Sequence, residues 1–191
     1  MAEQIHYPLR TGYMDELGPA YGFGKGAAEP GNTALAGGLS AIRGLTFGAG
    51  DYVDVVIQMN HDVAIPATGN VVFDAHCHVT FVAAPAAGAT VIFEFEYIGA
   101  KPTTDGSATF SDTSATLTTA TYTCDGNETR KHFLWDMGNI TIPVADYGSS
   151  YILWGTFRMK STATVAAAKC ALLAFDLHKK VGPRGTVTEY A

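Results

Sequence analysis

Apolar and polar residues alternate with a period of two from about residue 45 onward, as in strands that bury one face. The clearest runs are residues 52–59, 71–81 and 91–98. Further β-rich runs follow at about 116–124, 131–136, 139–144, 150–160 and 169–178. Turn-forming residues separate these runs, as in Pro66-Ala-Thr-Gly-Asn70 and Asp125-Gly-Asn127. The pattern predicts about eight strands and an all-β, jelly-roll-like β-sandwich over residues 45–191.

The segment from Val165 to Ala174 is the one stretch whose pattern also suits a helix. Leu173, Phe175 and Leu177 alternate with Asp176 and His178 just beyond it. This alternation favours a strand.

Residues 1–44 differ from the rest of the chain. About half of the 21 glycines lie before residue 51, and the scattered Tyr, Phe and Leu residues there keep neither a helical nor a strand period. Glycine loses much backbone entropy on ordering, so this segment cannot order on its own hydrophobic contacts. We expect an extended N-terminal arm, either a flexible tail or an arm that docks on neighbouring subunits.

Charge narrows the choice of partners. Charged residues make up 16% of the chain, below the roughly 25% of an average soluble protein, which suggests that much of the surface meets other protein. The formal net charge is -6, and no basic run exceeds a pair such as Lys179-Lys180. Binding to nucleic acid or to an anionic membrane surface needs a basic face, so neither partner is expected.

Cysteine content and apolar runs indicate where the chain folds. Cys77, Cys124 and Cys170 are odd in number and contain no Cys-x-x-Cys pair, which argues against a secreted disulfide framework. Neither a signal peptide nor an apolar stretch of about 18 residues is recognisable. We therefore expect folding in a reducing cytoplasm.

The strongest candidate for chemistry is the run Asp74-Ala-His76-Cys-His78. On a strand Asp74, His76 and His78 share one face, and two imidazoles with a carboxylate can bind a metal ion. Cupins build such a site inside a jelly roll, but Asn70 stands where their motif has glycine, and no Glu follows His78 at the required spacing. We therefore expect no metal and no cofactor. If the chain is instead a metal-dependent, cupin-like enzyme, Asp74, His76 and His78 are the candidate metal ligands.

Other residue types suggest no catalytic site. Alternation places Cys77 on the apolar face opposite both histidines, so neither can activate its thiol, and a core position is expected. No catalytic residue is assigned. Four aromatic residues are expected to pack in the core or at edges, or to form a sugar-binding platform: Trp135, Tyr147, Tyr151 and Trp154.

Four runs of residues carry a resemblance to a known group of proteins: 57–61 (IQMNH), 74–81 (DAHCHVTF), 91–97 (VIFEFEY) and 172–178 (LLAFDLH). With the glycine-rich arm, they resemble the small jelly-roll structural proteins of tailed bacteriophages, over about residues 50–185. That group includes capsid decoration (cement) proteins and head-fibre or tail-associated proteins.

The resemblance implies a non-enzymatic virion protein on the capsid surface that binds the major capsid protein and stabilises the head. It also implies self-association, as a homotrimer or alternatively a dimer. A tail or fibre-associated protein that binds host-surface glycans is the alternative function.

Overall fold

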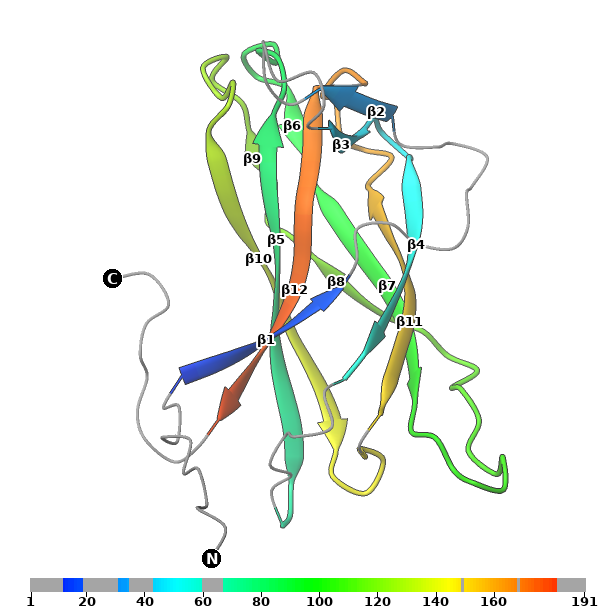
Figure 1. Ribbon diagram of the computed structural model, residues 1–191. Helices are drawn as coiled ribbons and strands as arrows, with labels where there is room; N and C mark the ends of the chain where they lie inside the picture. The colour runs from blue at the N-terminus through cyan, green and yellow to red at the C-terminus, as the bar shows by residue number, and fades with distance from the viewer. Residues whose placement is uncertain are drawn as a thin grey trace, which may run out of the picture.

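The computed structural model describes residues 12–18, 31–34, 43–59, 67–148, 150–167 and 169–181. Within these residues the chain forms strands and turns and no helix (Figure 1). The strands are β1 (Gly12–Gly18), β2 (Gly31–Ala34), β3 (Arg43–Phe47), β4 (Tyr52–Gln58), β5 (Asn70–Phe81), β6 (Thr90–Val91), β7 (Phe93–Ala100), β8 (Ala115–Thr118), β9 (Tyr122–Thr123), β10 (His132–Pro143), β11 (Ile152–Met159) and β12 (Cys170–Val181).

Two antiparallel sheets form the layers of a sandwich. One has the strand order β10-β5-β12-β3-β2, with β1 paired to β12. The other has the order β4-β11-β7-β8, and β6 and β9 form a short additional pair. Figure 1 shows the sheet that contains β5, β10 and β12 on one side of the molecule and β4, β7 and β11 on the other.

The pairing of the strands is that of a jelly roll. β3 pairs with β12, β4 with β11, β5 with β10, and β7 with β8, so the chain runs as nested antiparallel pairs wrapped into two sheets. The predicted all-β, jelly-roll-like sandwich is confirmed.

Aromatic rings from both sheets fill the space between the layers. The rings of Phe47 and Phe93 meet edge to face with centroids 5.6 Å apart. Phe175 lies 4.6 Å from Phe95 and 5.4 Å from Phe157. All five rings are buried, and contacts of this kind stabilise a core beyond simple area burial.

The alternating sequence pattern is reproduced in β4 and β5, where buried and more exposed residues follow each other. The runs 131–136 and 139–144 belong to a single strand, β10, because a β-bulge between Asp136 and Gly138 shifts the register. Gly138 adopts a φ of 98° there, which glycine tolerates far better than other residues.

A second bulge changes one expectation about β12. The segment is a strand, as predicted, but the register shifts between Leu172 and Ala174. As a result Leu172 is buried and Leu173 is 39% exposed, so Leu173 does not share the inward face of Phe175.

Two parts of the region predicted as an arm are strands of the larger sheet. β1 pairs with the C-terminal half of β12, and β2 pairs with β3 at the other end of the sheet (Figure 1). Arg43 and Gly44 begin β3. The remainder of residues 1–44 lies outside the described residues.

Candidate functional site

A polar cluster lies on the outer face of the larger sheet, where β10, β5 and β12 run side by side. His76 is the Cα partner of Asp136 on β10 and of Asp176 on β12. One step along the face, Asp74 is the partner of Asn139 and His178 in the same way. β5, which lies between β10 and β12, therefore brings polar and ionisable residues from the three strands into adjacent rows.

Strict alternation on two strands builds this cluster. On β5, Cys77 points into the core and is fully buried, so His76 and His78 project from the opposite face. On β12, Phe175 and Leu177 point inward, and Asp176 and His178 take the outer face. The two strands thus contribute Asp-x-His and His-x-His patterns to one surface.

Three members of the cluster are shielded from solvent although they lie on an outer face. His76 is 1% exposed, Asp176 4% and His178 5%. The side chain of His78 is 25% exposed. Buried ionisable groups are retained where partners compensate for lost hydration, so the contacts within the cluster matter.

The Nε2 atoms of three imidazoles converge on the carboxylate of Asp176. Those of His76 and His78 each lie 3.3 Å from Oδ2, and that of His178 lies 2.9 Å from it. His78 Nε2 is also 3.3 Å from the other oxygen, Oδ1. Nε2 of His76 lies 3.1 Å from Nε2 of His178.

The environment of Asp176 favours its ionised form. Burial opposes ionisation, but the hydrogen bond from His76, the charges of His76 and His78 and the hydrogen bond from His178 together lower the pKa of Asp176 below its usual value. A negative charge is therefore held among three imidazoles.

The cluster extends to β10 through a fourth histidine. Nδ1 of His78 lies 2.7 Å from Nε2 of His132, and the two rings stack with centroids 4.9 Å apart. This contact fixes the ring of His78 with its Nε2 toward Asp176.

His76, His78 and Asp176 each offer one ligand atom, and these atoms all lie within 4.8 Å of one another. They are the one such group among the residues that the structure describes. The expected candidates His76 and His78 are thus brought together, and the carboxylate beside them comes from β12, a residue that the sequence argument did not select.

Asp74, the third candidate, lies next to this group in a different role. Burial, and after it the charge of Asp136, raises the pKa of Asp74, although His76 and His178 act in the opposite direction. Asp74 is therefore a carboxylate whose negative charge is disfavoured in its position.

The other sequence candidates fall in different places. Cys77 is in the core, as predicted, and burial raises the pKa of its thiol. Tyr147 and Tyr151 are buried and stack on each other, and Trp135 is partly buried against the core. Trp154 differs from these three because it is 52% exposed.

The sequence matches no protein-family model, and no curated protein matches it. Within the described part of the chain, no helix has the length and apolar character needed to cross a membrane.

Proposed function

We propose that this chain is a non-enzymatic structural protein of a tailed-bacteriophage virion, namely a capsid decoration or cement protein that binds the major capsid shell and stabilises the head. The sequence resemblance supplies the virion setting, and the jelly-roll sandwich is compatible with it. In this proposal the N-terminal region contributes contacts to the shell, and copies of the chain associate as a homotrimer.

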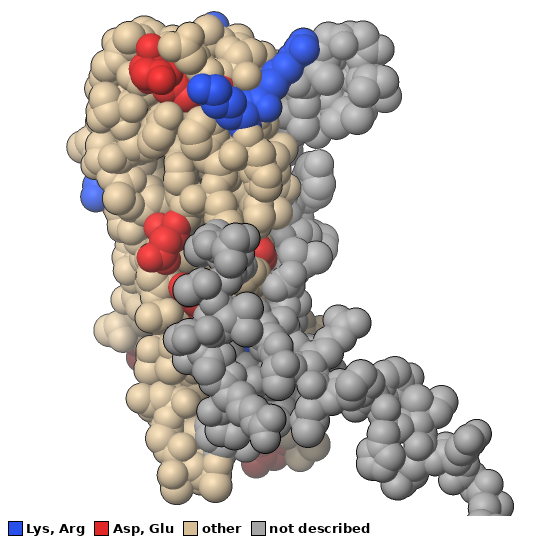
Figure 2. All heavy atoms as spheres, turned by 90° about the vertical axis from the view of Figure 1, so that its left-hand side faces the viewer, with Lys and Arg blue, Asp and Glu red and all other residues tan. Residues whose placement is uncertain are grey.

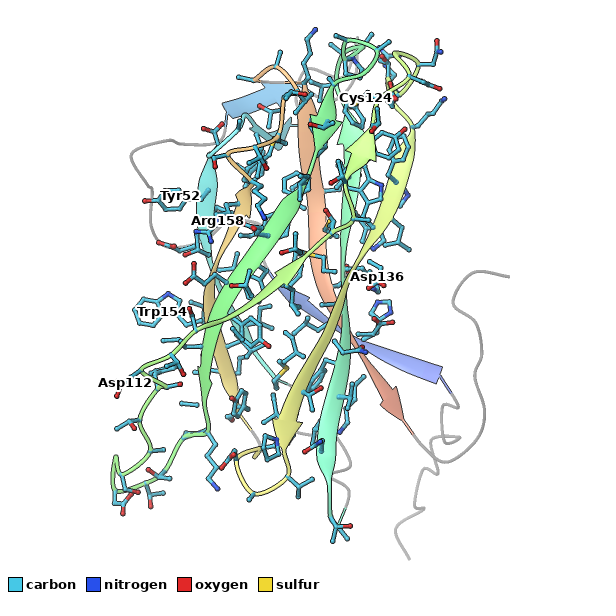
Figure 3. All side chains as sticks on the ribbon, turned by 180° about the vertical axis from the view of Figure 1, so that it is seen from behind. Tyr52, Asp112, Cys124, Asp136, Trp154 and Arg158 are labelled. Carbon is cyan, nitrogen blue, oxygen red and sulfur yellow. The ribbon has the colours of Figure 1, made fainter. Side chains whose placement is uncertain are left out.

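The observation that carries the proposal is an apolar surface on the outer face of the smaller sheet and its β7–β8 loop, in which Trp154 and Phe110 are exposed and the other members are half-buried. We call it the Trp154 surface, and it consists of Val56, Ile98, Phe110, Ile152 and Trp154. Trp154 lies between Val56 of β4 and Ile98 of β7 in the strand register. The ring of Phe110 meets Trp154 edge to face at 6.1 Å. Figure 3 shows Trp154 projecting outward on the opposite side of the molecule from Asp136.

Large exposed aromatic residues are typical of protein contacts, because they bury much area at little cost in side-chain entropy. Figure 2 views the molecule from the side opposite Trp154, where most of the described surface is formed by uncharged residues. We propose a second copy of the chain as the occupant of the Trp154 surface.

Charge next to this surface supports self-association. On the same sheet Arg158 lies 3.0 Å from carboxylate oxygens of both Glu94 and Glu96, and Lys160 lies 2.8 Å from Glu94. These two positive and two negative side chains are paired within the chain, so the region does not repel an identical surface. In addition, β4 is an edge of its sheet, and edges are commonly covered by neighbouring subunits.

Light scattering after size-exclusion chromatography tests the proposal. We expect a mass of three times the 20.1 kDa of one chain, and a lower mass for Trp154→Ser. Leu173→Ser is the matched control, because Leu173 is an exposed apolar residue on the other sheet. A monomeric wild-type chain, or a Trp154→Ser variant of unchanged mass, would contradict assembly through this surface.

Co-sedimentation tests the virion assignment itself. We expect the purified chain to pellet with capsids built from the major capsid protein of the same genome, at a saturable ratio. Failure to bind such capsids, or a genome without a capsid gene, would overturn the assignment even if the chain is a trimer.

The exposed ring of Trp154 also favours a second candidate, a fibre-associated protein that binds host-surface glycans. An indole face is a suitable stacking platform for a sugar ring. Specific glycan-array binding that Trp154→Ser removes without changing the oligomeric mass would favour this candidate over the first.

A further inference from the structure

We propose that His76, His78 and Asp176 bind one divalent transition-metal ion of the zinc class on the outer face of the larger sheet. The ion would join β5 to β12. This inference goes beyond the proposed function and does not rest on it.

Spacing is the first argument. Zinc binds imidazole nitrogen and carboxylate oxygen at about 2.0–2.2 Å, so two ligand atoms of a tetrahedral ion lie about 3.3–3.4 Å apart. Nε2 of His76 and Nε2 of His78 each lie 3.3 Å from the same oxygen of Asp176, Oδ2. Both nitrogen–oxygen separations therefore match those around a bound ion.

The donor set selects the class of metal. Two imidazoles and one carboxylate suit zinc and neighbouring first-row ions, whereas magnesium and calcium prefer oxygen ligands. The donors also come from a sheet whose registers fix them: Asp176 and His76 are direct partners on adjacent strands. Rigid elements hold ligands more accurately than loops do.

Neighbouring groups orient the ligands in the way that metal sites require. For Nε2 of His78 to bind a metal, its Nδ1 must carry the proton, and Nε2 of His132 lies 2.7 Å away as the acceptor. On the other side, His178 Nε2 lies 2.9 Å from Oδ2 of Asp176 and can donate to it. His132 and His178 are thus positioning residues for His78 and Asp176.

A close contact between imidazoles also suits a cation. Nε2 of His76 lies 3.1 Å from Nε2 of His178, so a proton can lie on only one of these two atoms along the line that joins them. If His178 donates to Asp176, an unprotonated Nε2 on His76 avoids two N–H groups facing each other, and in the metal-bound state this nitrogen would bind the ion in place of its hydrogen bond to Asp176. The metal-bound protonation state is therefore consistent across all four histidines.

The test uses the full chain without a histidine tag, stripped with chelator and titrated with zinc alone or with cobalt(II) as a spectroscopic probe. We expect one equivalent per chain, a cobalt spectrum typical of nitrogen and oxygen ligands, and a melting temperature that rises by about 5–10 °C at a hundredfold excess over the dissociation constant.

Variants distinguish a built site from adventitious binding. His78→Gln and Asp176→Asn should each abolish stoichiometric binding, and His132→Ala should weaken it about 10–100-fold. Asp136→Asn is the matched control, because Asp136 faces His76 on the same surface but is not in the ligand set, and its affinity should be unchanged. His78 is the most exposed ligand, so His78→Gln serves where a buried variant does not fold.

Several outcomes would overturn the site. One is the failure of the folded wild-type chain to bind one equivalent of zinc or cobalt. Another is unchanged affinity in folded His78→Gln, which would show that the ion binds elsewhere. Loss of binding in His178→Gln together with full binding in His78→Gln would also show the ligand set to be wrong.

Discussion

The ring of Phe95 lies directly over Gly155, which faces the core from the neighbouring strand β11. A Cβ atom on Gly155 would come within 2.7 Å of the Phe95 ring and would also overlap the carbonyl oxygen of Glu96. The missing side chain at residue 155 therefore makes room for a ring that packs between the two sheets.

Gly155→Ala should consequently destabilise the fold. Because both the ring and a backbone oxygen would have to shift, we expect a loss of about 2–3 kcal/mol in the free energy of unfolding, measured by urea denaturation. Gly148→Ala is the control, since a Cβ there would make only ordinary contacts of 3.7 Å or more with Lys101. Equal effects of the two substitutions would show that Phe95 does not depend on Gly155.

Glu128 provides a second prediction, because its buried carboxylate holds a turn. It is 1% exposed and accepts hydrogen bonds from the backbone N–H groups of Asp125 and Gly126 and from the hydroxyl of Tyr122. Glu128→Ala should leave those donors unpaired and cost about 1–3 kcal/mol by denaturant unfolding. Glu128→Gln, which keeps one acceptor oxygen, should cost less, and the reverse order would contradict this role.

The ion pairs of Glu94 predict a dependence of stability on pH. Burial opposes its ionisation, but hydrogen bonds and charges from Lys160 and Arg158 lower the pKa of Glu94 overall. The unfolded chain therefore takes up this proton first as the pH falls. The stabilisation is present above the ordinary glutamate value of about 4.3 and is lost as the pH drops through the lower folded value.

Glu94→Gln should flatten the stability profile between about pH 5 and pH 3 and lower stability at neutral pH by about 1 kcal/mol. Urea unfolding measured at several pH values would show this. Asp112→Asn, at an exposed loop position, should leave the slope unchanged. A Glu94→Gln profile parallel to that of the wild type would mean that its ion pairs contribute nothing.

The three thiols should be inert in the folded protein. Burial raises the pKa of Cys77 and Cys170, and burial followed by the charge of Glu128 raises that of Cys124 to about 11. Since the thiolate is the reactive form, an aromatic disulfide reagent at pH 8 should label the native chain only at the rate of unfolding. In urea all three should react at once, and rapid labelling without urea would contradict their burial.

Much of the fold follows from the alternation of residues, but the site required knowledge of strand pairing. The period of two placed His76 and His78 on one face, and Asp176 and His178 on another, in separate strands. Whether those faces meet depends on register and on which strands are neighbours, and local sequence does not determine either. Asp74 was chosen because it is close in sequence, whereas Asp176 is one hundred residues from His76 and directly beside it in the sheet.

The alternation of apolar and polar residues also did not predict the two bulges. At Gly138 the glycine itself was a signal, because an isolated glycine within a strand pattern often marks a bulge. At Leu173 no such residue is present, and the exposure of that leucine follows only from the register shift of β12 against β5.

The nested pairing of strands has a consequence for how the chain folds. β12, the last described strand, pairs with β5 and β3, so the larger sheet closes only across contacts that span most of the chain. Such long-range closure makes folding slow, because loop entropy is lost before the pairing compensates for it. During synthesis β3 and β5 leave the ribosome well before their central partner, and their unpaired edges are open to other chains until β12 arrives.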